Sequence, residues 1–191
     1  IDVYDMTQAV NDGATRPVYY ESRVIKLKLN DTVLAQIDAE YDRLREEGAS
    51  EADLEENKKE MSHMDALLGN DATINDLVND IITHYEDNRQ HICCGKAMLV
   101  AYSRPIAMKI YKRILELRSE WTERVKVVMT SGNQDPEEWA DIIGGKAYKK
   151  ELAKKFKDEN DPMKIAIVVD MWLTGFDVPS LATMYVYKPM K

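Results

Sequence analysis

The stretch Ile165-Ala-Ile-Val-Val-Asp-Met-Trp-Leu-Thr-Gly-Phe-Asp-Val-Pro179 decides the fold class of this chain. It opens with an apolar run that ends in an acidic residue, and a loop carrying Thr174, Gly175 and Asp177 follows. A second apolar run, Thr183 to Tyr187, comes soon after. A glycine flanked by polar side chains, just beyond the carboxyl end of a buried strand, is typical of a ligand site in an open α/β sheet.

Two apolar runs further upstream are expected to be strands of the same sheet, namely Ala97 to Tyr102 and Val125 to Met129. The first is continuous, as in strands that are buried on both faces of a parallel sheet. Ser103-Arg104-Pro105 leads from it into a helix, because proline is well tolerated at an early helical position. The predicted core stripe of that helix is Ile106, Ile110, Ile114 and Leu117.

A second helix is predicted to start at Asp135-Pro136-Glu137-Glu138, which combines an N-cap residue, an early proline and an acidic first turn. Gly144-Gly145 interrupts the helical pattern, which resumes through Leu152 and Phe156. The alternation of strands and helices predicts right-handed crossovers, and hence an α/β fold with a mostly parallel sheet flanked by helices.

The first half of the chain has a different pattern. Residues 18–29 alternate between apolar and polar side chains and favour a strand, whereas residues 31–48 have apolar side chains at helical spacing. The highly charged residues 49–62 are expected to form a solvated helix, and a third helix should be capped by Thr73. Its predicted apolar stripe is Ile74, Leu77, Val78, Ile81, Ile82 and Tyr85. Residues 30–94 are therefore predicted to form a helical insertion.

The composition narrows the class of protein. A net charge of −8 over 191 residues argues against a chain that grips DNA by bulk electrostatics, but it allows a local basic groove. No apolar run approaches the ~20 residues that cross a bilayer, and the first residues do not resemble a signal peptide. Cys93 and Cys94 are expected to be free thiols, and no Cys/His spacing predicts a metal site. The absence of an initiator Met and the end just after a strand-like run predict a piece of a longer protein.

The segment Asp170-Met-Trp-Leu-Thr-Gly-Phe-Asp-Val-Pro-Ser-Leu181 resembles motif V of superfamily 2 helicases and, in detail, the motor of the restriction (R) subunit of type I restriction enzymes. Tyr102-Ser103-Arg104 resembles motif IV, and the N-terminal residues 4–23 resemble the segment that links the two motor lobes. The resemblance implies a second RecA-like lobe at 95–191, truncated before motif VI, and an interlobe segment with the first strand or strands of that lobe at 1–29.

The resemblance also implies roles for individual residues. Nucleotide contacts are implied at Thr174, Gly175 and Asp177, and nucleic-acid contacts at Ser103, Arg104, Thr130 and Ser131. A hydroxyl and a guanidinium at a helix start suit a phosphate, and small polar loop residues let backbone N–H groups approach one. Simpler structural roles stay open: a helix cap for Ser103, a polar turn at Thr130, and a turn residue at Asp177. Val169 stands where many members have a DNA-contacting threonine, which favours a nucleotide role for the loop.

The chain has no phosphate-binding loop of the form G-x-x-x-x-G-K-[ST], since Gly95-Lys96 and Gly145-Lys146 are each followed by alanine. The resemblance implies that ATP and Mg²⁺ serve a longer parent, whose first motor lobe carries that loop. That parent hydrolyses ATP to translocate double-stranded DNA before cleaving it, in the bacterial cytoplasm, together with modification and specificity subunits. The chain alone is expected to have no ATPase activity and no bound cofactor.

Two other functions are considered. The charged helix at 50–62 and the acidic balance are compatible with a non-enzymatic α/β interaction module, and the motif V likeness with a lobe of another superfamily 2 DNA translocase. Trp139 and Trp172 are interpreted as packing residues rather than base-stacking platforms. The histidines His63, His84 and His91 are interpreted as solvated side chains rather than ligands.

Overall fold

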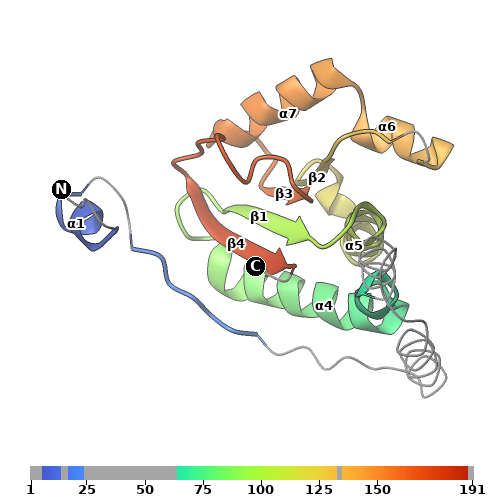
Figure 1. Ribbon diagram of the computed structural model, residues 1–191, viewed down its shortest axis with the longest axis horizontal. Helices are drawn as coiled ribbons and strands as arrows, with labels where there is room; N and C mark the ends of the chain where they lie inside the picture. The colour runs from blue at the N-terminus through green and yellow to red at the C-terminus, as the bar shows by residue number, and fades with distance from the viewer. Residues whose placement is uncertain (1–5, 14–16, 24–63, 133–134, 189–191) are drawn as a thin grey trace, which may run out of the picture.

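The computed structural model of this chain describes residues 6–13, 17–23, 64–132 and 135–188 (Figure 1). The predicted α/β class is confirmed, because the described residues form a parallel sheet of four strands with helices on both faces. The strands lie in the order β2-β3-β1-β4. Their bounds are Lys96–Ala101 for β1, Val125–Val128 for β2, Ile165–Val168 for β3 and Leu181–Tyr187 for β4.

Strand β1 lies at the centre of the sheet, and all of its residues are buried. Leu99 pairs with Ile167 of β3 on one side and with Tyr185 of β4 on the other. Because β1 has neighbours on both edges and helices over both faces, the continuous apolar run from Ala97 to Ala101 suits its surroundings. Since all strands run in the same direction, the loops that follow them start from one common edge of the sheet.

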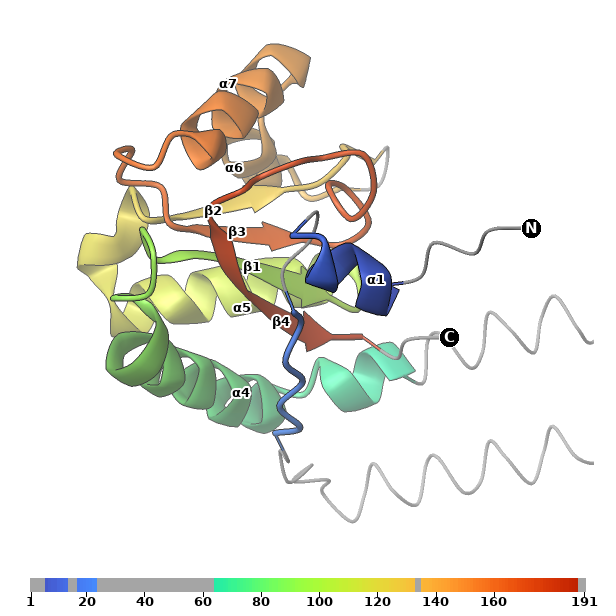
Figure 2. The same cartoon turned by 90° about the vertical axis from the view of Figure 1, so that its left-hand side faces the viewer.

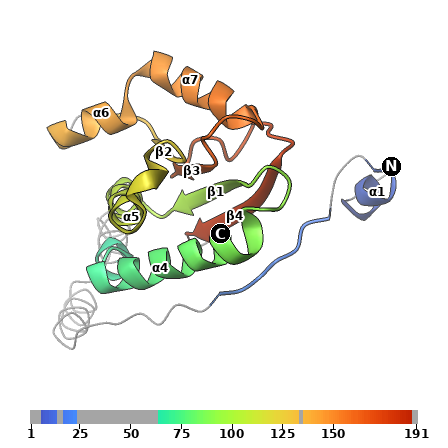
Figure 3. The same ribbon diagram turned by 180° about the vertical axis from the view of Figure 1, so that it is seen from behind.

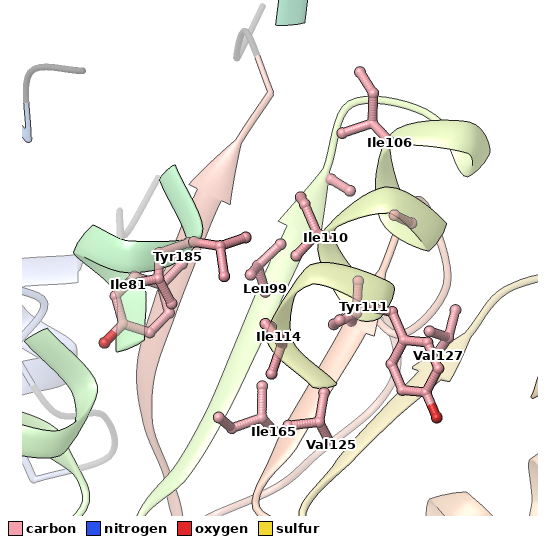
Figure 4. Close-up of a cluster of buried hydrophobic side chains, with 14 of the residues drawn as sticks. Ile81, Leu99, Ile106, Ile110, Tyr111, Ile114, Val125, Val127, Ile165 and Tyr185 are labelled. Carbon is pink, nitrogen blue, oxygen red and sulfur yellow. The ribbon is translucent and has the colours of Figure 1, made fainter. Parts of the chain in front are cut away.

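Two helices cover one face of the sheet: α4 (Asp71–His84) and α5 (Arg104–Leu117). Figure 4 shows the side chains of Ile110 and Ile114 directed from α5 towards the strands that carry Leu99 and Ile165. Burying one such isoleucine is worth about 1.5–3 kcal/mol, so the apolar stripe holds α5 on the sheet. The predicted stripe of α5 is confirmed at Ile106, Ile110 and Ile114, which are buried.

The start of α4 differs from the prediction. The N-cap is Asn70, whose side-chain oxygen accepts a hydrogen bond from the Ala72 N–H at 2.9 Å, whereas Thr73 is fully buried inside the first turn. Residues 64–68 form a helix that ends at Gly69, and α4 continues at its far end into a π-helical turn, Tyr85–Arg89. The predicted apolar stripe of α4 is buried in full.

The opposite face is covered by α7 (Lys146–Lys157), whose Leu152 and Phe156 pack on Met98 and Val168. Figures 1 and 3 show α7 and α4 on opposite sides of the sheet. Before α7 comes the short α6 (Ala140–Ile143), which ends at Gly144 with a left-handed φ of 59°. The strong helix start predicted at Asp135 is wrong in detail. A 3₁₀ turn, Glu137–Trp139, forms there instead, because the carboxylate of Asp135 is used elsewhere. A further 3₁₀ turn, Ser119–Thr122, links α5 to β2.

The N-terminal part contains α1 (Met6–Asn11) and residues 17–23, which have no regular secondary structure. The predicted strand at 18–29 is therefore wrong for 18–23, and residues 24–29 lie outside the described residues, as do the helices predicted at 31–48 and 49–62. Tyr19 and Tyr20 are almost fully exposed, so the alternating pattern has no sheet to face. Figure 2 shows residues 17–23 as an extended segment between α1 and the helical layer.

Candidate functional site

The loops after β1 and β2 meet at the carboxyl edge of the sheet. Arg104, which opens α5 directly after β1, forms an ion pair through Nη2 with Oδ2 of Asp135. The same carboxylate oxygen accepts the N–H of Gly132, in the loop after β2, at 2.7 Å. Asp135 therefore joins the two loops in which nucleic-acid contacts were predicted.

The space around Gly132 at this junction is tight. A Cβ built there would lie 3.0 Å from Arg104 Nη1 and 3.2 Å from Asp135 Oδ1. The side chain of Arg104 is 26% exposed and that of Asp135 is 18% exposed, so the pair is partly withdrawn from water but still reachable. Partial burial strengthens an ion pair relative to a fully exposed one.

Three hydroxyl residues adjoin this group in the chain: Ser103 directly precedes Arg104, and Thr130 and Ser131 directly precede Gly132. Ser103 occupies the N-cap position of α5, but its side chain makes no capping bond, and its Oγ is buried without a hydrogen-bond partner among the described residues. Thr130 and Ser131 are exposed. The capping role considered for the Ser103 hydroxyl is thus absent in this structure, while two further hydroxyls stand open at the same edge.

The loop after β3 is held by a column of aromatic rings. Trp172 has a left-handed φ of 67°, which is costly for a bulky residue, and it stacks on Phe176 with ring centroids 4.1 Å apart. Trp172 also stacks on Phe156 of α7 at 5.6 Å, and Lys157 Nζ lies 4.8 Å from the centre of the Phe176 ring. The packing role predicted for Trp172 is confirmed. The stack folds the loop back on itself and leaves its tip outside.

Thr174 and Gly175 form that tip and are exposed, as is Asp177. Gly175 has a φ of 69°, and nothing lies within 4 Å of a Cβ built on it, so glycine is favoured there by backbone conformation rather than by space. Within the described residues, no hydrogen bond or ion pair joins this tip to Arg104 or Asp135. The predicted nucleotide and nucleic-acid residues therefore form two separate groups.

Sequence reasoning missed Gly132 and Asp135, and it misjudged His84. That histidine is buried rather than solvated, and its Nδ1 shares a hydrogen bond of 2.9 Å with the Tyr185 hydroxyl of β4. Its Nε2 lies 3.6 Å from Glu21 Oε2. Burial lowers the pKa of His84, with the positive charge of Arg23 acting in the same direction. His91 is exposed, as predicted, and His63 lies outside the described residues.

A buried lysine lies at the amino end of β1. Lys96 is fully buried, and its ammonium donates to the Met163 carbonyl at 2.5 Å and to the Lys155 carbonyl at 3.2 Å. Burial lowers the pKa of Lys96. The side chain ties the central strand to the end of α7, so this lysine serves the packing of the sheet.

Three further properties concern the residues that the structure describes. No cluster of three or more His, Cys, Asp or Glu side chains is arranged to hold a metal ion within these ranges. None of their helices is long and apolar enough to cross a membrane. Cys93 and Cys94 are both free thiols.

Comparison with known proteins gives two matching family descriptions. Residues 133–191 match "Type I restriction enzyme subunit R domain 3", and residues 1–60 match "SWI2/SNF2 ATPase". The two matches lie on either side of α4, β1, α5 and β2, and the match at 133–191 includes the inner strand β3 and the edge strand β4. The second implies ATP use by the proteins of that family.

Individual relatives match over the whole chain. It is 39% identical over 200 residues to the type I restriction enzyme HindI endonuclease subunit of Haemophilus influenzae, and 39% identical over 194 residues to the putative MjaIXP endonuclease subunit of Methanocaldococcus jannaschii. A second M. jannaschii relative, the putative MjaVIIP endonuclease subunit, is 27% identical over 219 residues. All of this chain is covered in each case, but only 18% of the first two relatives and 20% of the third.

Proposed function

We propose that this chain, which belongs to the R-subunit family of type I restriction enzymes, forms most of the second RecA-like lobe of an ATP-driven DNA motor. In this proposal residues 95–191 are the lobe, residues 30–94 are a helical insertion, and residues 1–29 belong to the segment between the lobes. The observation that carries it is the parallel sheet whose carboxyl edge bears Arg104 and the Gly175 loop. Open α/β sheets bind their ligands at that edge.

The loop tip after β3 is proposed to supply the second half of an ATP site. The exposed carboxylate of Asp177 can accept hydrogen bonds from the hydroxyls of a ribose. Because it would repel the triphosphate, we expect it at the ribose end of the nucleotide. Gly175 offers a backbone that no side chain shields. In this proposal the stacked rings of Trp172, Phe176 and Phe156 fix the position of Thr174 and Gly175 but do not contact the nucleotide themselves. Bound ATP with Mg²⁺ would supply the energy of phosphoryl transfer, and the phosphate-binding residues would come from the first lobe.

The group around Arg104 is proposed to contact the backbone of double-stranded DNA. A guanidinium and the exposed hydroxyls of Thr130 and Ser131 are suited to phosphate oxygens, which position a protein on a duplex without reading its sequence. The hydroxyl of Ser103 is buried in this structure and would have to be uncovered to join them. In the whole R subunit, closure of the two lobes over ATP would move this edge along the DNA before cleavage. The modification and specificity subunits, and the bacterial cytoplasm as the location, belong to the same proposal.

Substitution Asp177→Ala in an R subunit carrying this segment tests the motor role. We expect DNA-dependent ATP hydrolysis to fall by at least about tenfold, because about 1.4 kcal/mol of lost interaction suffices for that factor. Asp141→Ala, at another exposed aspartate, is the matched control and should retain activity. Unchanged ATP hydrolysis and translocation in a folded Asp177→Ala protein would favour the non-enzymatic module instead. The isolated chain should not hydrolyse ATP in either case.

A further inference from the structure

One carboxylate oxygen of Asp135, Oδ2, accepts hydrogen bonds from two different segments of the chain. Arg104 Nη2 comes from the helix that follows β1, and the Gly132 N–H comes from the loop that follows β2. A guanidinium and a backbone N–H that converge on one anionic oxygen are the donors that proteins commonly offer to a phosphate. Here the oxygen belongs to the chain itself.

The geometry is tight on the side of Gly132. Any side chain at position 132 would press on the guanidinium, since a Cβ would lie 3.0 Å from Arg104 Nη1. Glycine at position 132 therefore lets the guanidinium lie close to the backbone of the β2 loop, and a larger residue would push it away by a few tenths of an ångström. The exposed hydroxyls of Thr130 and Ser131 come directly before it.

We propose that Asp135 occupies the position of a DNA phosphate, and that a phosphate of bound DNA displaces it from Arg104 and Gly132. This inference rests on the proposed function, in which Arg104 contacts DNA. While the carboxylate is bound, Arg104 Nη2 and the Gly132 N–H are occupied, so only the fraction of molecules with the carboxylate released can offer both donors to one phosphate oxygen. An internal competitor lowers the apparent affinity by that fraction.

Such a competitor suits a motor that must release one phosphate to reach the next. Because Asp135 pairs with Arg104 whenever no phosphate is bound, the partly buried guanidinium is never left without an anionic partner between steps. An unpaired buried charge is costly in free energy. The exchange of a phosphate for the Asp135 carboxylate therefore lowers the free-energy cost of releasing each phosphate. Asp135 would thus set how firmly this edge of the sheet holds DNA.

The test compares Asp135→Asn with the wild type in an R subunit carrying this segment, using the anisotropy of a short labelled DNA duplex over a series of salt concentrations. The neutral amide still accepts the Gly132 N–H but competes poorly for Arg104. We expect binding about five-fold tighter near 0.1 M salt, with a similar slope of log K against log salt concentration, because the same phosphate contact forms in both proteins and only the internal competitor is lost. Asp141→Asn makes the same charge change at an exposed site and should alter the affinity much less.

Two more variants separate the possible failures. Arg104→Ala should weaken binding, and Asp135→Asn added to it should bring no gain. If Asp135→Asn weakens binding as Arg104→Ala does, Asp135 only positions the arginine, and the competitor role is overturned while the DNA contact stands. If Arg104→Ala leaves binding unchanged, the DNA contact itself fails. If the Asp135→Asn protein does not fold, Asp135→Ser replaces it in the test. The serine hydroxyl can also accept a hydrogen bond from the Gly132 N–H, and we expect the same increase in affinity for DNA.

Discussion

The ring of Trp172 lies 4.1 Å from the ring of Phe176, and the two planes are only 15° apart. This contact between residues four apart in the chain closes the loop after β3 into a narrow turn, whose tip carries Thr174 and Gly175. Phe156 extends the stack towards the core, and Lys157 covers its outer ring. The left-handed backbone at Trp172 is thus offset by ring stacking on both sides.

Replacing Trp172 by alanine should destabilise the protein by about 3–4 kcal/mol. The loss combines a large, partly buried ring with its two stacking partners, each pair being worth about 0.5–1.5 kcal/mol beyond area burial. Denaturant unfolding measures the change, and Trp172→Phe should restore a large part of it. Trp139→Ala removes a half-buried indole away from this column and serves as the control. A Trp172→Ala protein as stable as the wild type would show that the column does not hold the loop.

The environment of His84 predicts a loss of stability in mild acid. Its pKa in the folded protein is lowered below 6.5, first by burial and then by Arg23, although Glu21 and Asp80 oppose the shift. The folded state therefore binds fewer protons than the unfolded one in this range. The contribution is fully present above the unfolded pKa of about 6.5 and declines as the pH falls towards the lowered value.

Denaturant unfolding near neutral pH and near pH ~5 should measure this dependence, which His84→Gln should reduce. The groups facing the ring are Glu21, Arg23, Asp80, Arg89 and Tyr185. His91→Gln is the control, since that ring is exposed. A pH dependence that is the same in the His84→Gln and wild-type proteins would contradict the assignment.

The parts that sequence predicted well are those in which local pattern and tertiary packing agree. The apolar run at 97–102 was recognisable because β1 is buried on both faces, and the stripe of α5 because one helix face meets the sheet. Proline in the first turn after Ser103 also marked the start of α5 correctly. In these places, the side-chain types leave few alternatives.

The misses share a physical cause, which is a partner far away in the sequence. Asp135 has the local signature of an N-cap, but Arg104 lies 31 residues earlier and takes the carboxylate. His84 stands among polar residues, yet Tyr185, 101 residues later, completes its burial. Residues 18–23 alternate like a strand but have no ladder to join. The nucleotide and nucleic-acid roles of the site residues remain predictions.

The attachment of residues 17–23 to α4 gives a last test. Arg23 donates from Nε to Asp80 Oδ2 at 2.8 Å and from Nη2 to Oδ1 at 2.7 Å, a two-pronged pair between side chains that are about one third exposed. Surface pairs are usually worth ~0–1 kcal/mol, and the parallel geometry places this one near the upper end. A double-mutant cycle of Arg23→Ala and Asp80→Ala, measured by denaturant unfolding, should therefore give a coupling of about 1 kcal/mol. Arg23→Lys should lose a large part of it, because a lysine ammonium cannot match both carboxylate oxygens with a planar fork. Strictly additive effects would mean that the segment is not held on α4 by this pair.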